Sequence, residues 1–309
     1  MRSSTLRAYL ELLRLPNVFT AVADVMMGAW FVTASAVRPG LPLLRPGVML
    51  LLVGASCCLY LSGMVLNDYF DRDKDARERP ARPIPSRRVP ESAAQWFGSE
   101  LLILGVAMAW AASYLIGSAR PGVIALGLAA AVILYDAYLK QTLCGPLAMG
   151  ACRLLNVLLG MSVVTTAWEP AGFVVAGGLA LYIVGVTAFA RTEATISQRA
   201  PLVVGTLIIV AGMVTLAWFP NMTPTRVDRQ MGTWYLFWAV LVLQTAWRCL
   251  RAIADPRASN VQIAVKQCLL TLIVLDATVV FAVQGIWPAL CVIALLIPTM
   301  ILGRWIYST

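Results

Sequence analysis

Long apolar stretches alternate with short polar segments along the whole chain. Ten such stretches can be delimited, and each approaches the roughly 20 residues that an α-helix needs to cross a bilayer. They lie at residues 15–36, 47–67, 94–117, 121–139, 145–167, 171–190, 201–219, 233–252, 263–284 and 287–306. The run at 121–139 is short, and the last two runs are interrupted only at Gly285, with Pro288 just after it. The pattern predicts an all-α, polytopic membrane bundle.

The composition and the distribution of charge agree with this reading. Of the 309 residues, 60% are hydrophobic and 13% are charged, about half the charge content of a soluble domain. If the N-terminus is cytoplasmic and the spans alternate, 18 of the 24 Lys and Arg residues fall in cytoplasmic segments and five in outer segments. Cytoplasmic loops normally carry this excess. We therefore expect a multi-pass protein of the cell membrane, and the net charge of +9 requires no nucleic-acid partner.

We expect one transmembrane domain over residues 1–309, made of two repeat halves at about 15–139 and 145–252. The second apolar stretch ends at Asn67-Asp68 and opens a charged cytoplasmic loop. The sixth, four helices later, ends at Arg191-Thr192-Glu193 and opens another. Repeated halves around a central site are common among membrane proteins.

The residue types limit the chemistry. The chain has no histidine, which removes the commonest general base near neutral pH and the commonest zinc ligand. Its seven cysteines form no Cys-x-x-Cys pair, and we expect them to be small buried hydrophobic residues. Acid–base chemistry then falls to carboxylates, Lys, Tyr or water.

Charge is concentrated in one stretch, residues 67–92. Asp68, Asp71 and Asp75 are spaced i, i+3 and i+7, so a helix would place them on one face. Three stacked carboxylates repel one another, and a divalent cation with oxygen ligands is the usual means of neutralising them. Basic residues follow, including Arg72 and Arg82, and they suggest an anion that shares the metal, most simply a diphosphate.

Several polar residues lie within or beside the apolar stretches. Arg153 and Asn156 share one helix face, and a charge at that depth normally faces a cavity or a partner. For Asp276 we expect a structural pairing with Arg153. Asp136 and Lys140 are spaced i, i+4, which suits an ordinary helix ion pair, or else a Lys that reaches the diphosphate.

The acidic stretch also resembles a known motif. Asn67-Asp68-x-x-Asp71-x-x-x-Asp75, followed by Arg79-Pro80-x-Arg82-Pro83-Ile84-Pro85, is similar to the signature of the UbiA superfamily of intramembrane prenyltransferases. Further similarities are Tyr135-x-x-x-x-Lys140, Arg153-x-x-Asn156 and Arg14-x-Pro16-Asn17. A Gly-Pro-Leu-x-Met-Gly run at 145–150 and an Arg-x-Glu element at 191–193 resemble a divergent, EboC-like branch.

The resemblance implies nine core transmembrane helices around a central cavity with a lateral opening to lipid, so the tenth stretch lies beyond the usual count. It also implies residue roles. Asp68, Asp71 and Asp75 would hold Mg²⁺ and, with Lys140, form the catalytic group. The substrate-binding residues would be Asn17, Asn67, Arg72, Arg82, Tyr135, Lys140, Arg153, Asn156, Arg191 and Glu193.

The second acidic motif departs from the family pattern. The family usually has two aspartates after the sixth helix, whereas this chain has Ala190-Arg191-Thr192-Glu193. Glu193 is the one acidic residue there, so we expect it to be the remaining metal ligand on that side, with Arg191 contacting the diphosphate.

The expected function is Mg²⁺-dependent transfer of an isoprenyl group from a prenyl diphosphate to a small-molecule or lipid acceptor that the sequence does not identify. The main alternative is a metabolite or lipid carrier on the same scaffold, since fold does not fix function. A CDP-alcohol phosphotransferase also stacks aspartates at a membrane helix, but its Asp-Gly-x-x-Ala-Arg pattern is missing.

Overall fold

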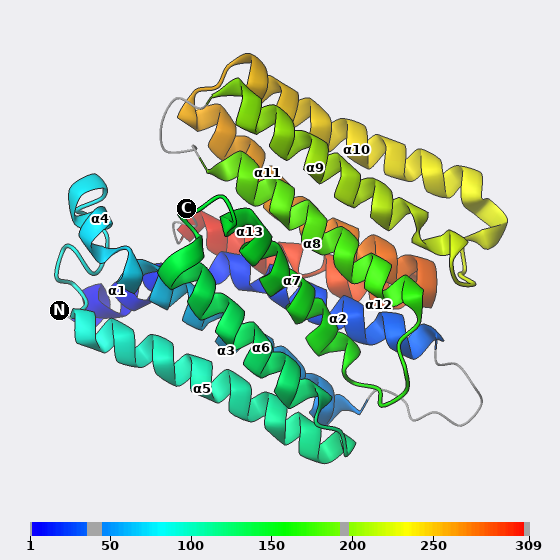
Figure 1. The fold of residues 1–309 in the computed structure, drawn as a ribbon, viewed down its shortest axis with the longest axis horizontal. Coiled ribbons are helices and arrows are strands. Elements are labelled where there is room, and N and C mark those ends of the chain that lie inside the picture. Colours follow the sequence, from blue (N-terminus) through cyan, green and yellow to red (C-terminus); the bar gives the residue numbers. More distant parts are fainter. Residues whose placement is uncertain (1, 36–44, 192–197, 306–309) are drawn as a thin grey trace.

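A computed structural model describes residues 2–35, 45–191 and 198–305, and these residues form a bundle of long helices without strands (Figure 1). The α-helices are α1 (Arg2–Leu13), α2 (Val18–Ser35), α3 (Pro46–Phe70), α4 (Arg72–Glu78), α5 (Glu91–Ile116), α6 (Arg120–Leu134), α7 (Gly145–Met161), α8 (Pro170–Ala190), α9 (Arg199–Trp218), α10 (Met231–Ala254), α11 (Ala258–Gln284), α12 (Ile286–Ile293) and α13 (Leu296–Trp305). Short helical turns are η1 (Leu15–Asn17), η2 (Tyr135–Leu139), η3 (Phe219–Asn221) and η4 (Asp228–Gln230).

Within the described ranges, nine helical segments are long and apolar enough to cross a membrane. The last of them, Ile286–Arg304, is the predicted tenth stretch, and the shorter apolar helix Gly145–Met161 completes the set of ten. The predicted all-α, multi-pass membrane bundle is therefore confirmed.

The helices are held together by close approaches at small residues. A Cβ on Gly160 of α7 would lie 2.2 Å from the Val25 carbonyl oxygen of α2, and one on Gly28 would lie 2.4 Å from the Val157 carbonyl oxygen. Small residues allow membrane helices to pack backbone against backbone. The crossing of α2 and α7 consequently brings polar side chains of both helices within hydrogen-bonding distance.

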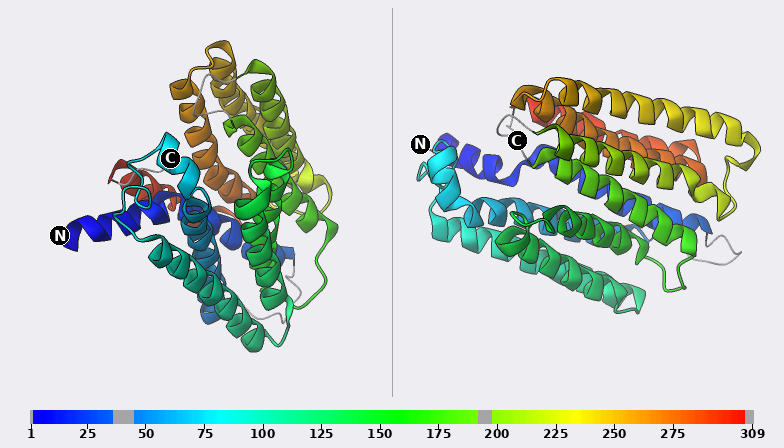
Figure 2. Two further views of the ribbon diagram at one scale, coloured as in Figure 1. Left: turned by 60° about the vertical axis from the view of Figure 1, so that its left-hand side comes forward. Right: turned by 45° about the horizontal axis from the view of Figure 1, so that its top comes forward.

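Two large hydrophobic cores share the interior, and a third, small one joins α1 to the loop before α5. The first large core is built mainly from α2, α7, α8, α9, α10, α11 and α12, and the second from α3, α5, α6 and α7 with Val25 of α2. The two views of Figure 2 show these groups as adjacent packs of helices. The cavity described below lies where they meet, among α2, α3, α6 and α7.

Some predicted boundaries need correction. The stretch predicted at 145–167 is helical only to Met161, where the Trp168 indole N–H donates to the Met161 carbonyl. The predicted interruption at Gly285 is confirmed, since its φ of 92° suits glycine and separates α11 from α12. Two of the cysteines expected to be buried, Cys144 and Cys291, are exposed.

Candidate active site

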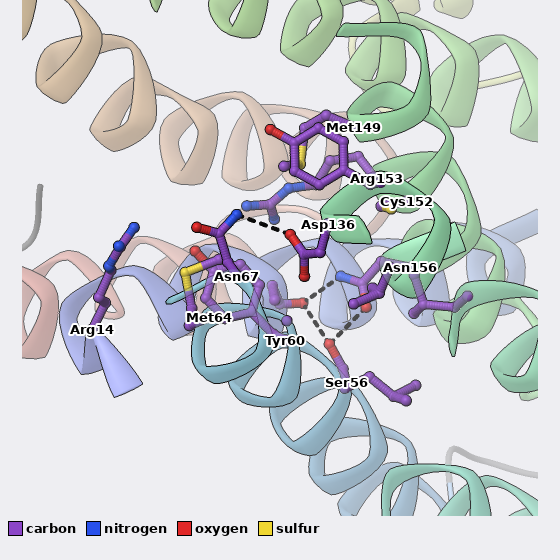
Figure 3. A pocket seen from close by; sticks show the side chains of 16 residues that line it. Arg14, Ser56, Tyr60, Met64, Asn67, Asp136, Met149, Cys152, Arg153 and Asn156 are labelled. Carbon is purple, nitrogen blue, oxygen red and sulfur yellow. Dashed lines mark hydrogen bonds between the residues drawn. The ribbon is translucent and has the colours of Figure 1, made fainter. Parts of the chain in front are cut away.

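A cavity of about 180 Å³ lies among α2, α3, α6 and α7 (Figure 3). One end is polar, with Arg14, Asn67 and Asp136. The middle is mostly apolar, and its lining includes Leu59, Met64, Leu128, Val132 and Met149. The other end is closed by a second polar group around Arg153 and Asn156. The cavity thus offers a hydrocarbon pocket between two polar regions.

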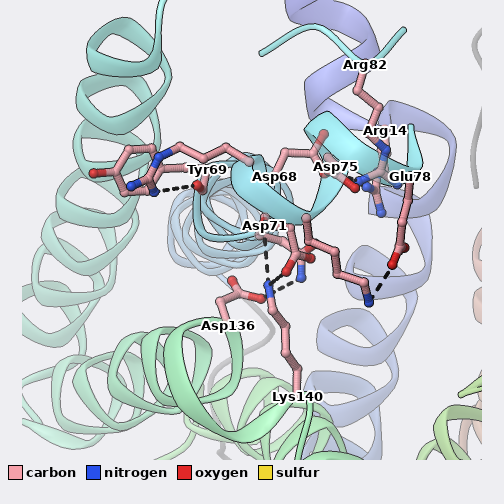
Figure 4. A network of polar contacts seen from close by, with 12 residues as sticks. Arg14, Asp68, Tyr69, Asp71, Asp75, Glu78, Arg82, Asp136 and Lys140 are labelled. Atoms are coloured by element: carbon pink, nitrogen blue, oxygen red, sulfur yellow. Dashed lines mark hydrogen bonds and ion pairs between the residues drawn. The ribbon is translucent and has the colours of Figure 1, made fainter. Parts of the chain in front are cut away.

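The polar end of the cavity is called the mouth below. The three predicted carboxylates lie beside it without lining the cavity, and Asp68 pairs with the lining residue Arg14 (Figure 4). α3 ends at Phe70 and α4 begins at Arg72, but the Asp71 N–H donates to the Asn67 carbonyl and the Asp75 N–H donates to the Asp71 carbonyl. The chain therefore keeps helical spacing across the junction. This spacing holds Asp68 and Asp75 against one Arg82 guanidinium nitrogen, at 3.2 and 2.6 Å.

Arg82 reaches the carboxylates because its loop folds back onto the bundle. Ile84 and Val89 in that loop are buried against Ala8 and Leu12 of α1. Prolines at 80, 83, 85 and 90 restrict the backbone of this segment. The Arg82 side chain is 16% exposed and the Asp75 side chain 6%, so their ion pair is largely shielded from solvent.

Arg14 supplies a second cation, and sequence reasoning did not assign it a site role. Its Nη2 lies 2.6 Å from the Asp68 Oδ1. Arg14 has φ 44° and ψ 47°, the left-handed region that a non-glycine residue seldom adopts. Such backbone strain is often found at functional sites. The one feature of the sequence that could have pointed to Arg14 is the Arg14-x-Pro16-Asn17 element, which resembles the family's pattern.

Lys140 supplies the third cation. Its Nζ lies 2.7 Å from the Asp71 Oδ1, and its main-chain N–H donates to the Tyr135 carbonyl at 2.9 Å. That bond closes a π-helical turn, a feature often found at functional sites. The predicted i, i+4 ion pair between Asp136 and Lys140 is therefore not formed. The wider turn directs the Lys140 side chain to Asp71, at the end of α3.

Asp136 lies just inside the mouth. Its Oδ1 accepts a hydrogen bond from the Asn67 Nδ2 at 2.9 Å, and its Oδ2 has no hydrogen-bond partner in the described part of the chain. The residue is only 3% exposed. A Cβ on Gly63 would lie 4.0 Å from that oxygen, so the bare backbone of Gly63 leaves room beside it. Asn67 and Tyr135 line the same part of the cavity.

The deep end is a hydrogen-bonded group built on α2 and α7. The Arg153 Nη1 lies 2.7 Å from the Asp24 Oδ2, and its Nη2 donates to the Thr20 hydroxyl at 2.8 Å. Asn156 donates to Asp24 at 3.0 Å and accepts from the Ser56 hydroxyl at 2.6 Å. The Arg153 guanidinium also lies 5.5 Å from the centroid of the Tyr60 ring.

The expected pairing of Asp276 with Arg153 is wrong. α7 packs directly on α2, whereas α11 packs on α2 from another side, so Arg153 reaches Asp24. Asp276 is fully buried, and neither of its carboxylate oxygens has a hydrogen-bond partner among the residues described.

Other predicted site residues lie apart from the mouth. Arg72 donates to the Tyr69 carbonyl, stacks on the Tyr69 ring and pairs with Glu91 at 3.3 Å. Arg191 is exposed, and its Nη2 lies 3.4 Å from the Gln141 carbonyl. Asn17 lines a different cavity, beside α11 and α13. Glu193 lies outside the described residues.

Fold and site together define a class: a multi-pass helical membrane protein with a mostly apolar cavity, beside whose mouth carboxylates and cations cluster. The family model for UbiA prenyltransferases matches residues 25–260. This is most of the 309-residue chain, and the protein belongs to the UbiA prenyltransferase family.

Solved structures agree on the fold. A UbiA homologue from Archaeoglobus fulgidus bound to GPP and Mg²⁺ is 15% identical, with a TM-score of 0.68, over 93% of this chain and 99% of that one. A digeranylgeranylglyceryl phosphate synthase structure is 20% identical, with a TM-score of 0.62, over 91% and 99%. At such identities the likeness shows the fold alone. No curated protein sequence matches the chain.

Proposed function

We propose that the protein transfers an isoprenyl group from a prenyl diphosphate to an acceptor, with the diphosphate at the mouth and the isoprenyl chain in the cavity. The observation that carries this proposal is the set of three carboxylates paired with three cations beside the mouth of a mostly apolar pocket, which one of the cations, Arg14, also lines. The same proposal fits the family and the prenyl diphosphates bound by the Archaeoglobus homologue.

The carboxylates suit Mg²⁺. No group of three or more acidic, Cys or His side chains in the described ranges is arranged as a metal centre. Mg²⁺, however, usually takes one or two protein carboxylates and completes its shell with phosphate oxygens and water. Asp68, Asp71 and Asp75 supply such oxygens, and the unpartnered Asp136 Oδ2 lies nearby. When bound, Mg²⁺ would neutralise charge on the diphosphate leaving group.

The remaining roles belong to side chains. Arg14, Arg82 and Lys140 would move from carboxylate to diphosphate oxygens, because carboxylates that bind Mg²⁺ no longer need them as partners. The allylic C–O bond breaks and its electron pair leaves with the diphosphate. A bond then forms between that carbon and the acceptor, which gives up a proton to the departing diphosphate or to water. The apolar lining keeps water from the cation-like carbon.

We further propose that Glu193 and Arg191 approach the same diphosphate, that Arg153 and Asn156 contact the far end of the substrate pocket, and that this site faces the cytoplasm. The carrier function is not favoured, because the chain belongs to a prenyltransferase family and a carrier has no need of stacked carboxylates. The acceptor is a small molecule or a lipid.

Binding and turnover test the proposal. Purified protein is titrated with geranyl, farnesyl and geranylgeranyl diphosphate, with Mg²⁺ or with EDTA, and both bound ligand and released diphosphate are measured. We expect Mg²⁺-dependent binding that Asp71→Ala and Glu193→Ala weaken. Asp73→Ala is the matched control, because Asp73 is an exposed residue of the same segment. Equal binding by Asp71→Ala and wild type would exclude the proposal.

A further inference from the structure

A second cavity, of about 170 Å³, lies beside the bundle and is separate from the candidate active site. Three segments enclose it: η1 with the start of α2, the first half of α11, and α13. All of its lining residues fall outside the range 25–260 matched by the family model. The family match therefore assigns nothing to this cavity.

The cavity combines two chemistries. Its walls include the aliphatic side chains of Val265, Leu269 and Leu270 from α11. Its edge carries two exposed cations, Lys266 of α11 and Arg304 of α13. Neither cation forms an ion pair or hydrogen bond with any other residue that the structure describes.

Neutral hydrogen-bonding groups complete the lining. Thr20 and Thr299 are 2% and 6% exposed, and Asn17 lies on η1. The Thr299 hydroxyl donates to the Leu295 carbonyl. The Thr20 hydroxyl donates to the Asn17 carbonyl and already accepts from Arg153 Nη2, so both hydroxyls are held within the protein. Among the residues that the structure describes, no Asp or Glu lines the cavity. The local charge is thus positive and not compensated within the cavity.

The position of the cavity, at one end of the bundle and beside an apolar surface, indicates the class of ligand. Pro16 and Asn17 lie two and three residues after Arg14, which pairs with Asp68, so the cavity lies at the same end of the bundle as the acidic site. Next to it, α13 exposes Ile297 and Ile301, at 62% and 53%, which suits a surface facing lipid. Basic pockets between transmembrane helices at such a boundary bind the headgroups of anionic lipids.

We propose that this cavity binds the phosphate headgroup of an anionic phospholipid. Lys266 and Arg304 hold the phosphate, and the start of an acyl chain lies against Leu269 and Leu270. The volume of about 170 Å³ has room for a phosphate group but is too small for a whole phospholipid. The acyl chains consequently extend into the bilayer along α11 and α13.

The aliphatic wall favours a lipid over a free phosphate ion. A soluble anion would be stabilised by the two cations, but it would make no favourable contact with Val265, Leu269 or Leu270. A phospholipid uses both and is already concentrated in the membrane. This inference does not depend on the proposed prenyl transfer, because no substrate of that reaction enters the argument.

The test measures lipid binding directly. Purified full-length protein in a neutral detergent is titrated with dioleoylphosphatidylglycerol, dioleoylphosphatidylcholine or inorganic phosphate. Bound lipid is counted by native mass spectrometry, and the thermal unfolding midpoint is recorded in parallel. We expect binding of phosphatidylglycerol in preference to the other two. We expect Lys266→Gln/Arg304→Gln to bind it about 30-fold more weakly, since each basic side chain contributes a factor of roughly five.

Two further variants serve as controls. Arg251→Gln/Arg257→Gln removes two exposed cations from the neighbouring helix and loop, outside the cavity, and should change binding by less than about two-fold. Lys266→Arg/Arg304→Lys keeps both charges and should retain binding. The proposal fails if the neutral variant binds phosphatidylglycerol as wild type does, if the charge-keeping variant loses binding equally, or if inorganic phosphate or phosphatidylcholine binds as tightly.

Discussion

Arg153 shows how a single residue can depend on partners that are far away in the sequence. It lies within an apolar stretch, where an unpaired charge is costly. Its guanidinium donates to Asp24 and Thr20, and Asn156 donates to the same Asp24 oxygen. The sequence predicts that it lies within an apolar stretch, but it pointed to Asp276 as the partner, and only the placement of the helices shows that the partner is Asp24.

We predict that Arg153→Met destabilises the protein by about 3–5 kcal/mol, because it leaves Asp24 buried without its counter-charge. Thermal or denaturant unfolding of purified protein in detergent measures the loss. The double variant Arg153→Met/Asp24→Leu should recover much of it, since no unpaired charge remains at that position. An unfolding midpoint for Arg153→Met equal to that of wild type would contradict the assigned ion pair.

Lys140 is the second informative residue. We predict that Lys140→Gln weakens Mg²⁺-dependent binding of a prenyl diphosphate by ten-fold or more, because it removes one of the three cations at the mouth. Isothermal calorimetry with geranyl diphosphate gives the affinity.

Lys74→Gln is the control for Lys140→Gln. Lys74 is 52% exposed and lies 3.9 Å from Glu78, so its loss should change affinity by less than about two-fold. If both variants bind alike, Lys140 has no special role at the diphosphate.

At the scale of elements, the length of the apolar stretches predicted which segments are membrane-spanning helices, but it predicted the ends of those helices less well. The π turn at Tyr135–Leu139, the kink at Arg14 and the junction at Asp71 are small backbone events. Each redirects a charged side chain toward the mouth. Hydropathy does not encode them, since they depend on which carbonyl each N–H meets after the helices have packed.

The close backbone contact between α2 and α7 can be tested by replacing one glycine. We predict that Gly160→Ala destabilises the fold by roughly 1–3 kcal/mol or more, because its Cβ would lie 2.2 Å from the Val25 carbonyl oxygen and the helices must separate. The unfolding midpoint in detergent reports this.

Gly177→Ala is the matched control for Gly160→Ala. Gly177 is helical and has no other atom within 4 Å of the added Cβ, so the change should be neutral or slightly stabilising. A stable Gly160→Ala variant would mean that α2 and α7 are not in backbone contact.

At the scale of the whole molecule, the orientation in the membrane and the two repeat halves stay predictions. The excess of basic residues predicts that the acidic segment lies in the cytoplasm. The two hydrophobic cores do not correspond to the halves 15–139 and 145–252, because α2 and α7 each pack across that division.

Orientation is open to a labelling test. With the other cysteines replaced, we predict that Cys144, which is exposed beside Lys140, reacts with a membrane-impermeant maleimide in inside-out vesicles but not in intact cells. A cysteine introduced by Asn221→Cys, at the opposite end of the bundle, should show the reverse pattern. Labelling of Cys144 in intact cells would show that the topology is the reverse of the predicted one.

The sequence by itself determined the all-helical membrane fold, the number of apolar stretches and the residue types of the metal–diphosphate motif. These depend on local hydrophobicity and on short-range spacing, which the chain carries without folding. Only the tertiary structure decided that Arg14, Arg82 and Lys140 meet the three aspartates, that Arg153 pairs with Asp24, and that Lys266 and Arg304 share a cavity. Each of these contacts joins residues from separate helices or loops, and the packing of small residues and apolar faces sets those distances.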